Sequence, residues 1–314
     1  MHFAAALALF AALVLAPVGA GAASLSAKGV TLLAPGGAGT VTDTVARLIA
    51  PGMSRQLGLP VEIEAMDAIE ALRRLEKGPD DGSLIGIADP LTLTLYWEGE
   101  ANNGRNHPLL TSIAKVTDGL SYALVVPEAS SIRDWPAFAS AARHGQMKLA
   151  HFGYGTTYGI AVTMMEQVLG AHFIDVPAAN TPELLGTTTA GGADAAVVAS
   201  YSVGRTVPGM RPLLTFGAER YPGFENVATL SEISGDRRYA FTSSLALFGP
   251  PKLRRTAQEA IENALMKVGR DPVVKQAAAA EHLPLNVGDE SVLDATLDRD
   301  QRVVGRIGYV PGLR

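Results

Sequence analysis

Cysteine is absent from this chain of 314 residues. Without cysteine there are no disulfides, no thiolate metal sites, no cysteine nucleophile and no lipid-bearing cysteine after an export signal. Chemistry that depends on sulfur is therefore excluded, apart from the eight methionines. A chain without cysteine also tolerates any redox compartment.

Positive charge is also scarce, and no basic run occurs anywhere in the chain. The formal net charge of −5 and the pI near 5.7 argue against a nucleic-acid partner. Heptad repeats, low-complexity tracts and an acidic tail are missing as well. The length is ample for a sizeable core and predicts about two domains.

The first 27 residues contain no Lys, Arg, Asp or Glu. An apolar segment from Phe3 to Leu15 is followed by Pro17 and Gly19, and Ala20–Ala22 offers a small-x-small cleavage site. This layout predicts a signal peptide over 1–22 and a periplasmic mature protein, although the n-region lacks a basic residue. An uncleaved anchor is the rival interpretation, but the apolar segment is shorter than the ~20 residues that a spanning helix needs.

The stretch Val30–Arg55 begins with a short apolar strand, continues through the glycine-rich segment Pro35–Gly39, and enters an amphipathic helix near Thr40 or Thr42. Glycines leave backbone N–H groups accessible, and a helix N-terminus adds unpaired donors and partial positive charge. This arrangement predicts a seat for a carboxylate or phosphate. A tight strand-to-helix turn without a ligand stays open as the alternative.

A second unit repeats this pattern. The strand Met147–Phe152 leads through the glycine loop Gly153–Thr157 into the helix Tyr158–Leu169. Alternating strands and helices predict parallel sheets, whose ligands bind at the carboxyl ends of strands. Two such units predict two lobes facing a cleft, joined by the strands Ser121–Val126 and Ala240–Phe248. The C-terminal helices are then expected to return to the first lobe.

Several short motifs occur in a fixed order along the chain. They are Ala34-Pro35 with Gly36-Gly37 and Asp43, Pro79-Asp80-Asp81-Gly82, Gly153-Tyr154-Gly155-Thr156, Val176-Pro177, Gly191-Gly192-Ala193-Asp194 and Gly249-Pro250-Pro251. Their order and spacing, over Val30 to Tyr309, resemble the extracytoplasmic solute-binding receptors of tripartite tricarboxylate transporters, called Bug receptors. No single motif is specific.

The resemblance implies an α/β fold of the type II periplasmic-binding-protein class, with two mostly parallel sheets flanked by helices and a cleft between. We expect lobe 1 over 23–124 and 247–314, and lobe 2 over 125–246. The implied ligand is a small carboxylate, typically a di- or tricarboxylate, and the implied partners are the permease subunits of a tripartite transporter. A monomer without cofactor, metal or enzyme activity is expected.

The family's ligand contacts, carried over by position, place one carboxylate at the first loop and another at the second. The first loop supplies Gly36, Gly37, Ala38, Thr40 and Asp43, and the second supplies Gly155, Thr156, Thr157 and Tyr158. Asp89, Ala178 and Asp194 complete the expected site. Capping its own glycine-rich turn is an equally good role for Asp194.

This chain departs from the family pattern at three places. Ala65-Met66-Asp67 runs directly into a helix where the family has a glycine-rich loop, which removes one expected wall. Ala178-Ala179-Asn180 replaces the usual Tyr-Lys-Gly, and Asp89 adds an acid near the cleft. A larger, amidated or amine-bearing acid is therefore an alternative to a plain dicarboxylate, and a degenerate site is another.

Other functions have weaker support. Gly37-x-Gly39-x-x-Thr42 resembles a dinucleotide fingerprint, with Glu62 or Glu64 near the spacing of a ribose-binding acid, but the third glycine is missing. There is no G-x-S-x-G motif, and Ser243-Ser244 is expected to pack or hydrogen-bond within a strand. The six histidines show no metal-binding spacing. A sensory binding protein that feeds a signalling system stays open.

Overall fold

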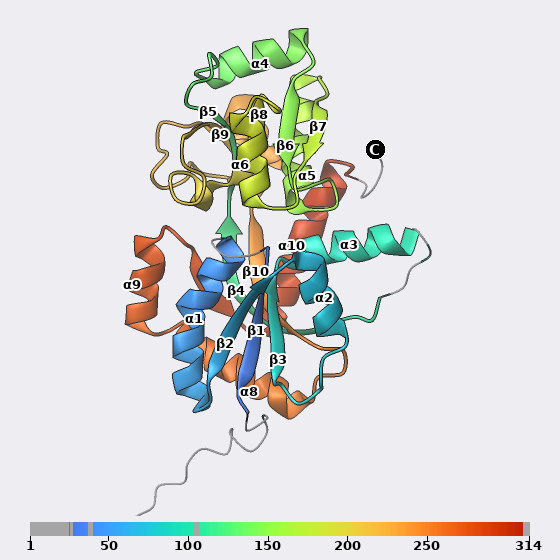
Figure 1. The fold of residues 1–314 in the computed structure, drawn as a ribbon, viewed down its shortest axis with the longest axis vertical. Coiled ribbons are helices and arrows are strands. Elements are labelled where there is room, and N and C mark those ends of the chain that lie inside the picture. The colour runs from blue at the N-terminus through green and yellow to red at the C-terminus, as the bar shows by residue number, and fades with distance from the viewer. Residues whose placement is uncertain (1–24, 26–27, 37–39, 103, 105–106, 310–314) are drawn as a thin grey trace, which may run out of the picture.

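The computed structural model describes residues 25, 28–36, 40–102, 104 and 107–309. The predicted signal peptide, together with Gly37 and Ala38, lies outside these residues. Two lobes, each built on one sheet, lie one above the other (Figure 1). No helix in the described part of the chain is both long enough and apolar enough to cross a membrane.

The first sheet has the strand order β11-β4-β10-β3-β1-β2. Its strands are β1 (Val30–Pro35), β2 (Val61–Met66), β3 (Leu84–Ala88), β4 (Thr111–Leu120), β10 (Ser243–Gly249) and β11 (Leu285–Gly288). Helices α1 (Val41–Leu57), α8 (Arg255–Val268) and α9 (Pro272–Ala280) bury an apolar cluster on one face. Helices α2 (Ala68–Glu76) and α3 (Pro90–Asn102) contribute to a second cluster around Leu33 and Phe248.

The second sheet has the order β7-β6-β8-β5-β9. Its strands are β5 (Tyr122–Pro127), β6 (Lys148–His151), β7 (Ile174–Pro177), β8 (Ala195–Ala199) and β9 (Met210–Thr215). Its helices are α4 (Trp135–His144), α5 (Thr157–Leu169), α6 (Thr181–Thr189) and α7 (Leu230–Ser234). The apolar residues of α4 and α5 share one core with Phe216, and Leu184 of α6 belongs to a separate cluster.

Both sheets are mixed, and most strands of each run in one direction, as expected. In the first, β1 runs parallel to β2 and β3, but β10 runs antiparallel to β3 and β4. In the second, β6 runs parallel to β7 and β8, but β5 runs antiparallel to β8 and β9. The antiparallel strands β10 and β5 are those that begin where the chain passes between lobes.

The predicted lobe boundaries fall inside strands. β5 pairs with strands of the second sheet from Tyr122 onward, and β10 pairs with the first sheet from Ser243 onward. We therefore propose that the chain crosses at Ser121 and over 240–242. Helix α4 begins at Trp135, because Asp134 accepts from Ala137 N and caps the helix there.

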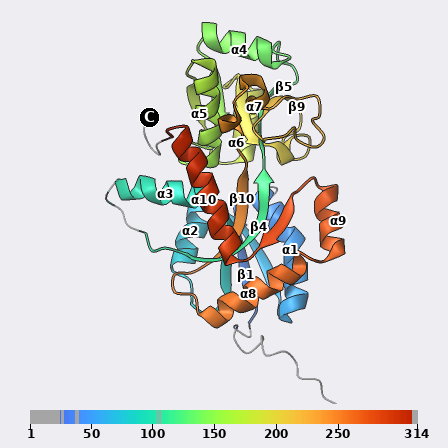
Figure 2. The same ribbon diagram turned by 180° about the vertical axis from the view of Figure 1, so that it is seen from behind.

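The last helix, α10 (Glu290–Arg306), does not stay with the first lobe. Leu293 near its start packs in the first lobe's core, while Ile307 and Tyr309 beyond its end pack in the core that contains α5. Figure 2 shows α10 running along the back of the molecule towards α5. The prediction that the C-terminal helices return to lobe 1 holds for α8 and α9 and is wrong for the end of α10.

Candidate functional site

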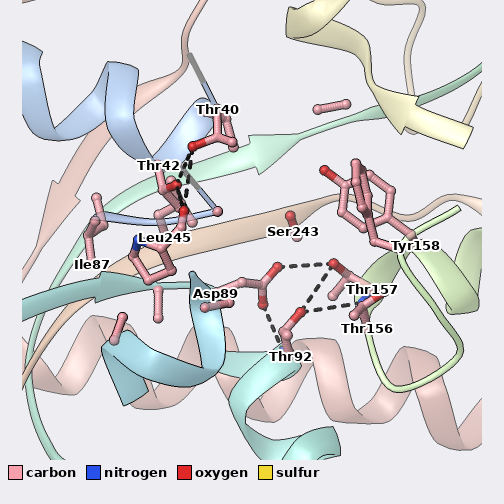
Figure 3. Close-up of a pocket in the computed structure, with 18 of the residues that line it drawn as sticks. Thr40, Thr42, Ile87, Asp89, Thr92, Thr156, Thr157, Tyr158, Ser243 and Leu245 are labelled. Carbon is pink, nitrogen blue, oxygen red and sulfur yellow. Dashed lines mark hydrogen bonds between the residues drawn. The ribbon is translucent and has the colours of Figure 1, made fainter. Parts of the chain in front are cut away.

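A cavity of about 480 Å³ lies between the two lobes. Lobe 1 lines it with the β1–α1 turn, the first turn of α2 and the β3–α3 turn, and lobe 2 with the starts of α5 and α6. Figure 3 shows the residues of these turns pointing toward one another across the cavity. Each turn follows the carboxyl end of a parallel strand, which is where open α/β sheets bind ligands.

The β1–α1 turn is shaped by glycine and threonine. Gly36 has a φ of +93°, which residues with a Cβ rarely adopt, and its N–H donates to Met66 O at 2.9 Å. Thr40 is the N-cap of α1 and accepts from Asp43 N at 3.3 Å. The hydroxyls of Thr40 and Thr42 lie 2.8 Å apart, and both line the cavity.

The start of α5 differs from most helix starts in this molecule. Its N-cap, Thr156, makes no side-chain cap, because its hydroxyl donates back to Gly153 O at 2.7 Å. By contrast, α1, α2, α4, α6, α9 and α10 each have a capping side chain. Across the cavity, the hydroxyl of Thr92 accepts from Thr157 N in the first turn of α5, at 3.4 Å. A helix start without a cap from its own N-cap residue, facing a cavity, is suited to a ligand carboxylate.

His151 holds the loop before α5. The side chain is 1% exposed, and its Nδ1 accepts from Gly153 N at 3.0 Å. Since Nδ1 accepts, Nε2 carries the proton and donates to Asp175 Oδ1 at 3.1 Å. His151 is therefore a positioning residue for the glycine loop and does not line the cavity.

Asp89 joins the lobes. Its Oδ1 caps α3 by accepting from Leu91 N at 2.9 Å and Thr92 N at 3.1 Å. Its Oδ2 accepts from the hydroxyl of Thr157 in the first turn of α5, at 3.2 Å. The hydroxyl of Thr92 also lies 3.4 Å from that of Thr157 (Figure 3). The starts of α3 and α5 thus meet around one carboxylate.

Burial is the main reason why the pKa of Asp89 is raised from 3.8 to about 7. The charge of Asp300 raises it further, whereas hydrogen bonds from Thr92 N, Leu91 N and Ser243 lower it. Burial, together with the charge of Asp89, also raises the pKa of Tyr122 and of Tyr158. Asp89 is therefore the one lining group of those described whose protonation changes near neutral pH.

Tyr122 and Ser243 meet where the chain passes between lobes. The phenol of Tyr122 lies 2.6 Å from both Ser243 Oγ and Thr157 Oγ1, and its ring stacks on Phe241 at 5.7 Å. The edge of Tyr122 also meets Tyr158 at 4.8 Å between ring centroids. These contacts hold the side chains of Tyr122 and Ser243 in place where they line the cavity.

The rest of the cavity is mostly apolar. It extends from the polar turns into a pocket that we call the apolar arm, lined by Leu33, Leu72, Leu75, Leu93, Tyr96 and Leu110. The five leucines belong to the core cluster beneath α2 and α3, and Tyr96 packs against it. Among the described lining residues there is no Lys, Arg or His, and the acids are Asp67 and Asp89.

Comparisons with known proteins assign the chain to a family. The model described as "Tripartite tricarboxylate transporter family receptor" matches residues 45–302. The chain belongs to this family. A UPF0065 protein of Bordetella pertussis is 22% identical to the receptor over 96% of each chain. A UPF0065 protein of Pseudomonas sp. is 24% identical over 77% of this chain and 73% of its own.

Solved structures share the fold of the receptor. MatC of Rhodopseudomonas palustris, solved with bound malate, superposes with a TM-score of 0.75 at 21% identity, covering 89% of this chain and 97% of its own. An R. palustris protein with adipate gives 0.77 at 18% identity, covering 90% and 98%. The periplasmic binding protein BugD gives 0.75 at 17% identity, with the same coverage.

The receptor brings most of the predicted site residues together. The predicted residues that line the cavity are Gly36, Thr40, Asp89, Gly155, Thr156, Thr157, Tyr158 and Ala178. Gly37 and Ala38 lie outside the described residues. The segment 178–180 also lines the cavity. Asp67 at the start of α2 lines it too, so that α2 supplies the wall that the sequence predicted to be missing.

Two predicted site residues do not line the cavity. Asp43 is buried in the first turn of α1, where both its carboxylate oxygens lie near Arg47, one helical turn on. Asp194 accepts from Lys148 N at 2.7 Å, at the amino end of β6, whereas the cavity lies at the carboxyl end. Asp194 thus ties the turn before β8 to the start of β6, which is neither the predicted ligand contact nor a cap of its own turn.

Sequence reasoning missed Thr92, Tyr122 and the apolar arm. Thr92 stands three residues after Asp89. An N-cap side chain accepts from the backbone N–H three residues on, so the spacing alone could have predicted that Asp89 caps a helix that contains Thr92. Ser243 was expected to hydrogen-bond within a strand; its partner is Tyr122. The arm is lined by leucines that also suit an ordinary core, so that no local signal marks it.

Among described residues, no group of three or more His, Asp or Glu side chains lies close enough together to hold a metal ion.

Proposed function

We propose that this receptor captures a small organic carboxylate between its two lobes in the periplasm and presents it to the permease subunits of a tripartite tricarboxylate transporter. It acts as a monomer, and closure of the lobes on the ligand is its function, without chemical conversion. Family membership supports the receptor role. The malate and adipate bound by proteins of similar fold support a carboxylate as ligand.

The observation that carries the proposal is the start of α5 beside the cavity, where the N-cap residue gives no side-chain cap. Thr156 turns its hydroxyl away from the helix, and the contact in place of a cap is the long one from Thr157 N to the Thr92 hydroxyl, at 3.4 Å. A bound anion can take the place of that contact. The β1–α1 turn lines the same cavity from the other lobe. A ligand that contacts both turns favours the closed arrangement by its differential affinity for it.

A thermal-shift panel tests the proposal. Mono-, di- and tricarboxylates, amino acids and aromatic acids are each added to the purified mature protein. A ligand at 100 times its Kd adds about 2.7 kcal/mol to the free energy of unfolding, which raises the melting temperature measurably. Calorimetry then gives stoichiometry and affinity. A panel in which no carboxylate raises the melting temperature contradicts the proposal.

A further inference from the structure

The cavity has two chemically different ends. Turns with backbone donors and threonine hydroxyls form one end, where Thr40 and Thr156 lie on opposite lobes. The apolar arm forms the other. It offers one polar atom, the phenol oxygen of Tyr96, against the side chains of five leucines. A ligand that fills this volume therefore has a polar head and an apolar tail.

A second carboxylate fits neither end. In the apolar arm it would lose its hydration without gaining a cationic partner, because the described lining contains no Lys, Arg or His. At the polar end it would add another anion beside Asp89 and the carboxylate seated at α5, again without a cationic partner in the described lining. Long and short dicarboxylates are both disfavoured by this lining.

Asp89 instead suits a hydrogen-bond donor. An ionised carboxylate only accepts hydrogen bonds, at about four lone-pair sites, and the donors around Asp89 are Leu91 N, Thr92 N, the Thr157 hydroxyl and Ser243. The bond from Thr157 is longer than those from the two amides, and the Thr157 hydroxyl also meets the phenol of Tyr122. Because Asp89 lines the cavity, a hydroxyl or ammonium group of a ligand can take the place of the Thr157 hydroxyl at Oδ2.

The position of Asp89 also sets where this donor lies on the ligand. Asp89 contacts the first turn of α5, which is the seat proposed above for the ligand carboxylate. A donor that reaches Asp89 while the carboxylate stays at α5 must stand close to that carboxylate, on the neighbouring carbon. The tail then points away from both, into the apolar arm.

On the premise of the receptor function above, we propose that the ligand is a 2-amino or 2-hydroxy monocarboxylic acid with an apolar side chain. Its carboxylate binds at the start of α5, its amino or hydroxyl group donates to Asp89, and its side chain fills the apolar arm. Asp89 is then the residue that selects such acids against dicarboxylates.

Four acids with the same six-carbon skeleton test this assignment: hexanoate, 2-hydroxyhexanoate, norleucine and adipate. Calorimetry on the mature protein at pH 8, where Asp89 is ionised, should give norleucine or 2-hydroxyhexanoate at least tenfold tighter binding than hexanoate and adipate. The eight-carbon homologues are measured alongside. Adipate binding as tightly as norleucine and 2-hydroxyhexanoate, or no binding by any member, overturns the assignment.

The variant Asp89→Asn keeps an oxygen for the amides of α3 but replaces Oδ2 with an NH₂ donor. It should remove the tenfold preference and leave adipate binding unchanged or tighter. The matched control is Asp67→Asn, because Asp67 also lines the cavity and caps a helix but is solvent-exposed. Equal loss of preference in both variants would overturn the role of Asp89.

The arm is tested by chain length. Leu93→Ala should move the best fit from the six-carbon to the eight-carbon amino acid, because it enlarges the arm. Leu84→Ala is the control: Leu84 belongs to the same core cluster but does not line this cavity. Melting temperatures show that both variants fold. An unchanged length optimum in Leu93→Ala overturns the place given to the side chain.

These outcomes are separable from those of the receptor function. If the broad panel finds a carboxylate ligand but the six-carbon series favours adipate, the receptor function stands and the ligand class proposed here is wrong. If no carboxylate in either set binds, the receptor function itself fails.

Discussion

At the scale of single residues, Asp89 and His151 carry the polar organisation of the site. Each side chain can take up or release a proton, and each holds nearby backbone in place. Asp89 caps α3 and reaches Thr157 in the opposite lobe, and His151 accepts from Gly153 N in the glycine loop. Because buried polar groups are costly without partners, both partnerships constrain the local backbone strongly.

The raised pKa of Asp89 predicts a pH-dependent stability. A carboxyl with a pKa of about 7 in the folded state and 3.8 in the unfolded state binds more protons when folded between these values. The free energy of unfolding should therefore fall as pH rises through this window. Asp300, whose burial raises its pKa to about 6, contributes in the same direction. The melting temperature of the ligand-free protein, measured from pH 5 to 8, checks this.

Asp89→Asn separates the contribution of Asp89 from that of Asp300, whose charge acts on Asp89 from α10. The pKa values of Tyr122 and Tyr158, which also face Asp89, are raised further above this pH range. The variant should lose less melting temperature than the natural protein between pH 5 and 8. Parallel pH curves for the two proteins would show that Asp89 does not bind the extra proton.

Replacing His151 should loosen the loop before α5. In His151→Leu, Gly153 N loses its acceptor, at a cost of about 1–3 kcal/mol for an unsatisfied buried donor. Ligand affinity should fall because the start of α5 is no longer held in place. Calorimetry with the tightest acid from the panel measures this. His144→Leu, at an exposed position on α4, is the control and should bind normally.

At the scale of elements, the site consists of helix starts placed at strand ends. The strands β1, β3 and β6 each lead through a short turn into a helix whose start lines the cavity. Side chains cap α1 and α3 from just before each helix, whereas α5 has no cap from its own N-cap residue and instead has the 3.4 Å contact from Thr157 N to the Thr92 hydroxyl. The difference is due to Thr156, which bonds to Gly153 O rather than to its own helix.

A side chain at position 155 should block this helix start. A Cβ on Gly155 would meet no atom within 4 Å, and its φ is not in the left-handed region, so that the fold tolerates Gly155→Val. The added side chain would stand in the cavity, and affinity should fall at least tenfold in calorimetry. Gly186→Val, equally unobstructed but in α6 away from the cavity, should bind normally. Equal affinity of the two variants would show that the start of α5 does not bind the ligand.

At the scale of the whole molecule, three connections join the lobes. The proposed crossings lie at Ser121 and over 240–242, and α10 links the two cores from behind (Figure 2). Gln167 Nε2 of α5 also donates to Ile307 O at 2.6 Å, just beyond the end of α10. The lobes are therefore linked along the back of the molecule as well as at the crossing segments.

The packing of Ile307 against lobe 2 predicts a stability effect. Ile307 is 5% exposed within the core that contains α5, so that Ile307→Ala should cost about 2–5 kcal/mol of the free energy of unfolding. Chemical denaturation measures this loss. Val292→Ala is the control on the same helix, because Val292 is 40% exposed, and should change stability by about 0.5 kcal/mol or less. Equal costs would mean that the end of α10 does not stabilise lobe 2.

The sequence by itself determined the local elements and the site turns. Glycines between an apolar strand and an amphipathic helix specify the turn because only glycine adopts the φ of +93° found at Gly36 without strain. These signals are local in the chain, and so the two-lobed fold could be predicted, together with the residues of the site turns that line the cavity. The motif order predicted the family in the same way.

Only the tertiary structure decided which side chains face one another. Asp194 lies at the wrong end of β6 and α10 crosses to lobe 2, both through packing between segments distant in sequence. The meeting of Asp89 with Thr157, 68 residues apart, depends on how the lobes are placed. The apolar arm likewise exists because α2 and α3 leave volume between leucines that any core would use, and sequence pattern carries no information about that volume.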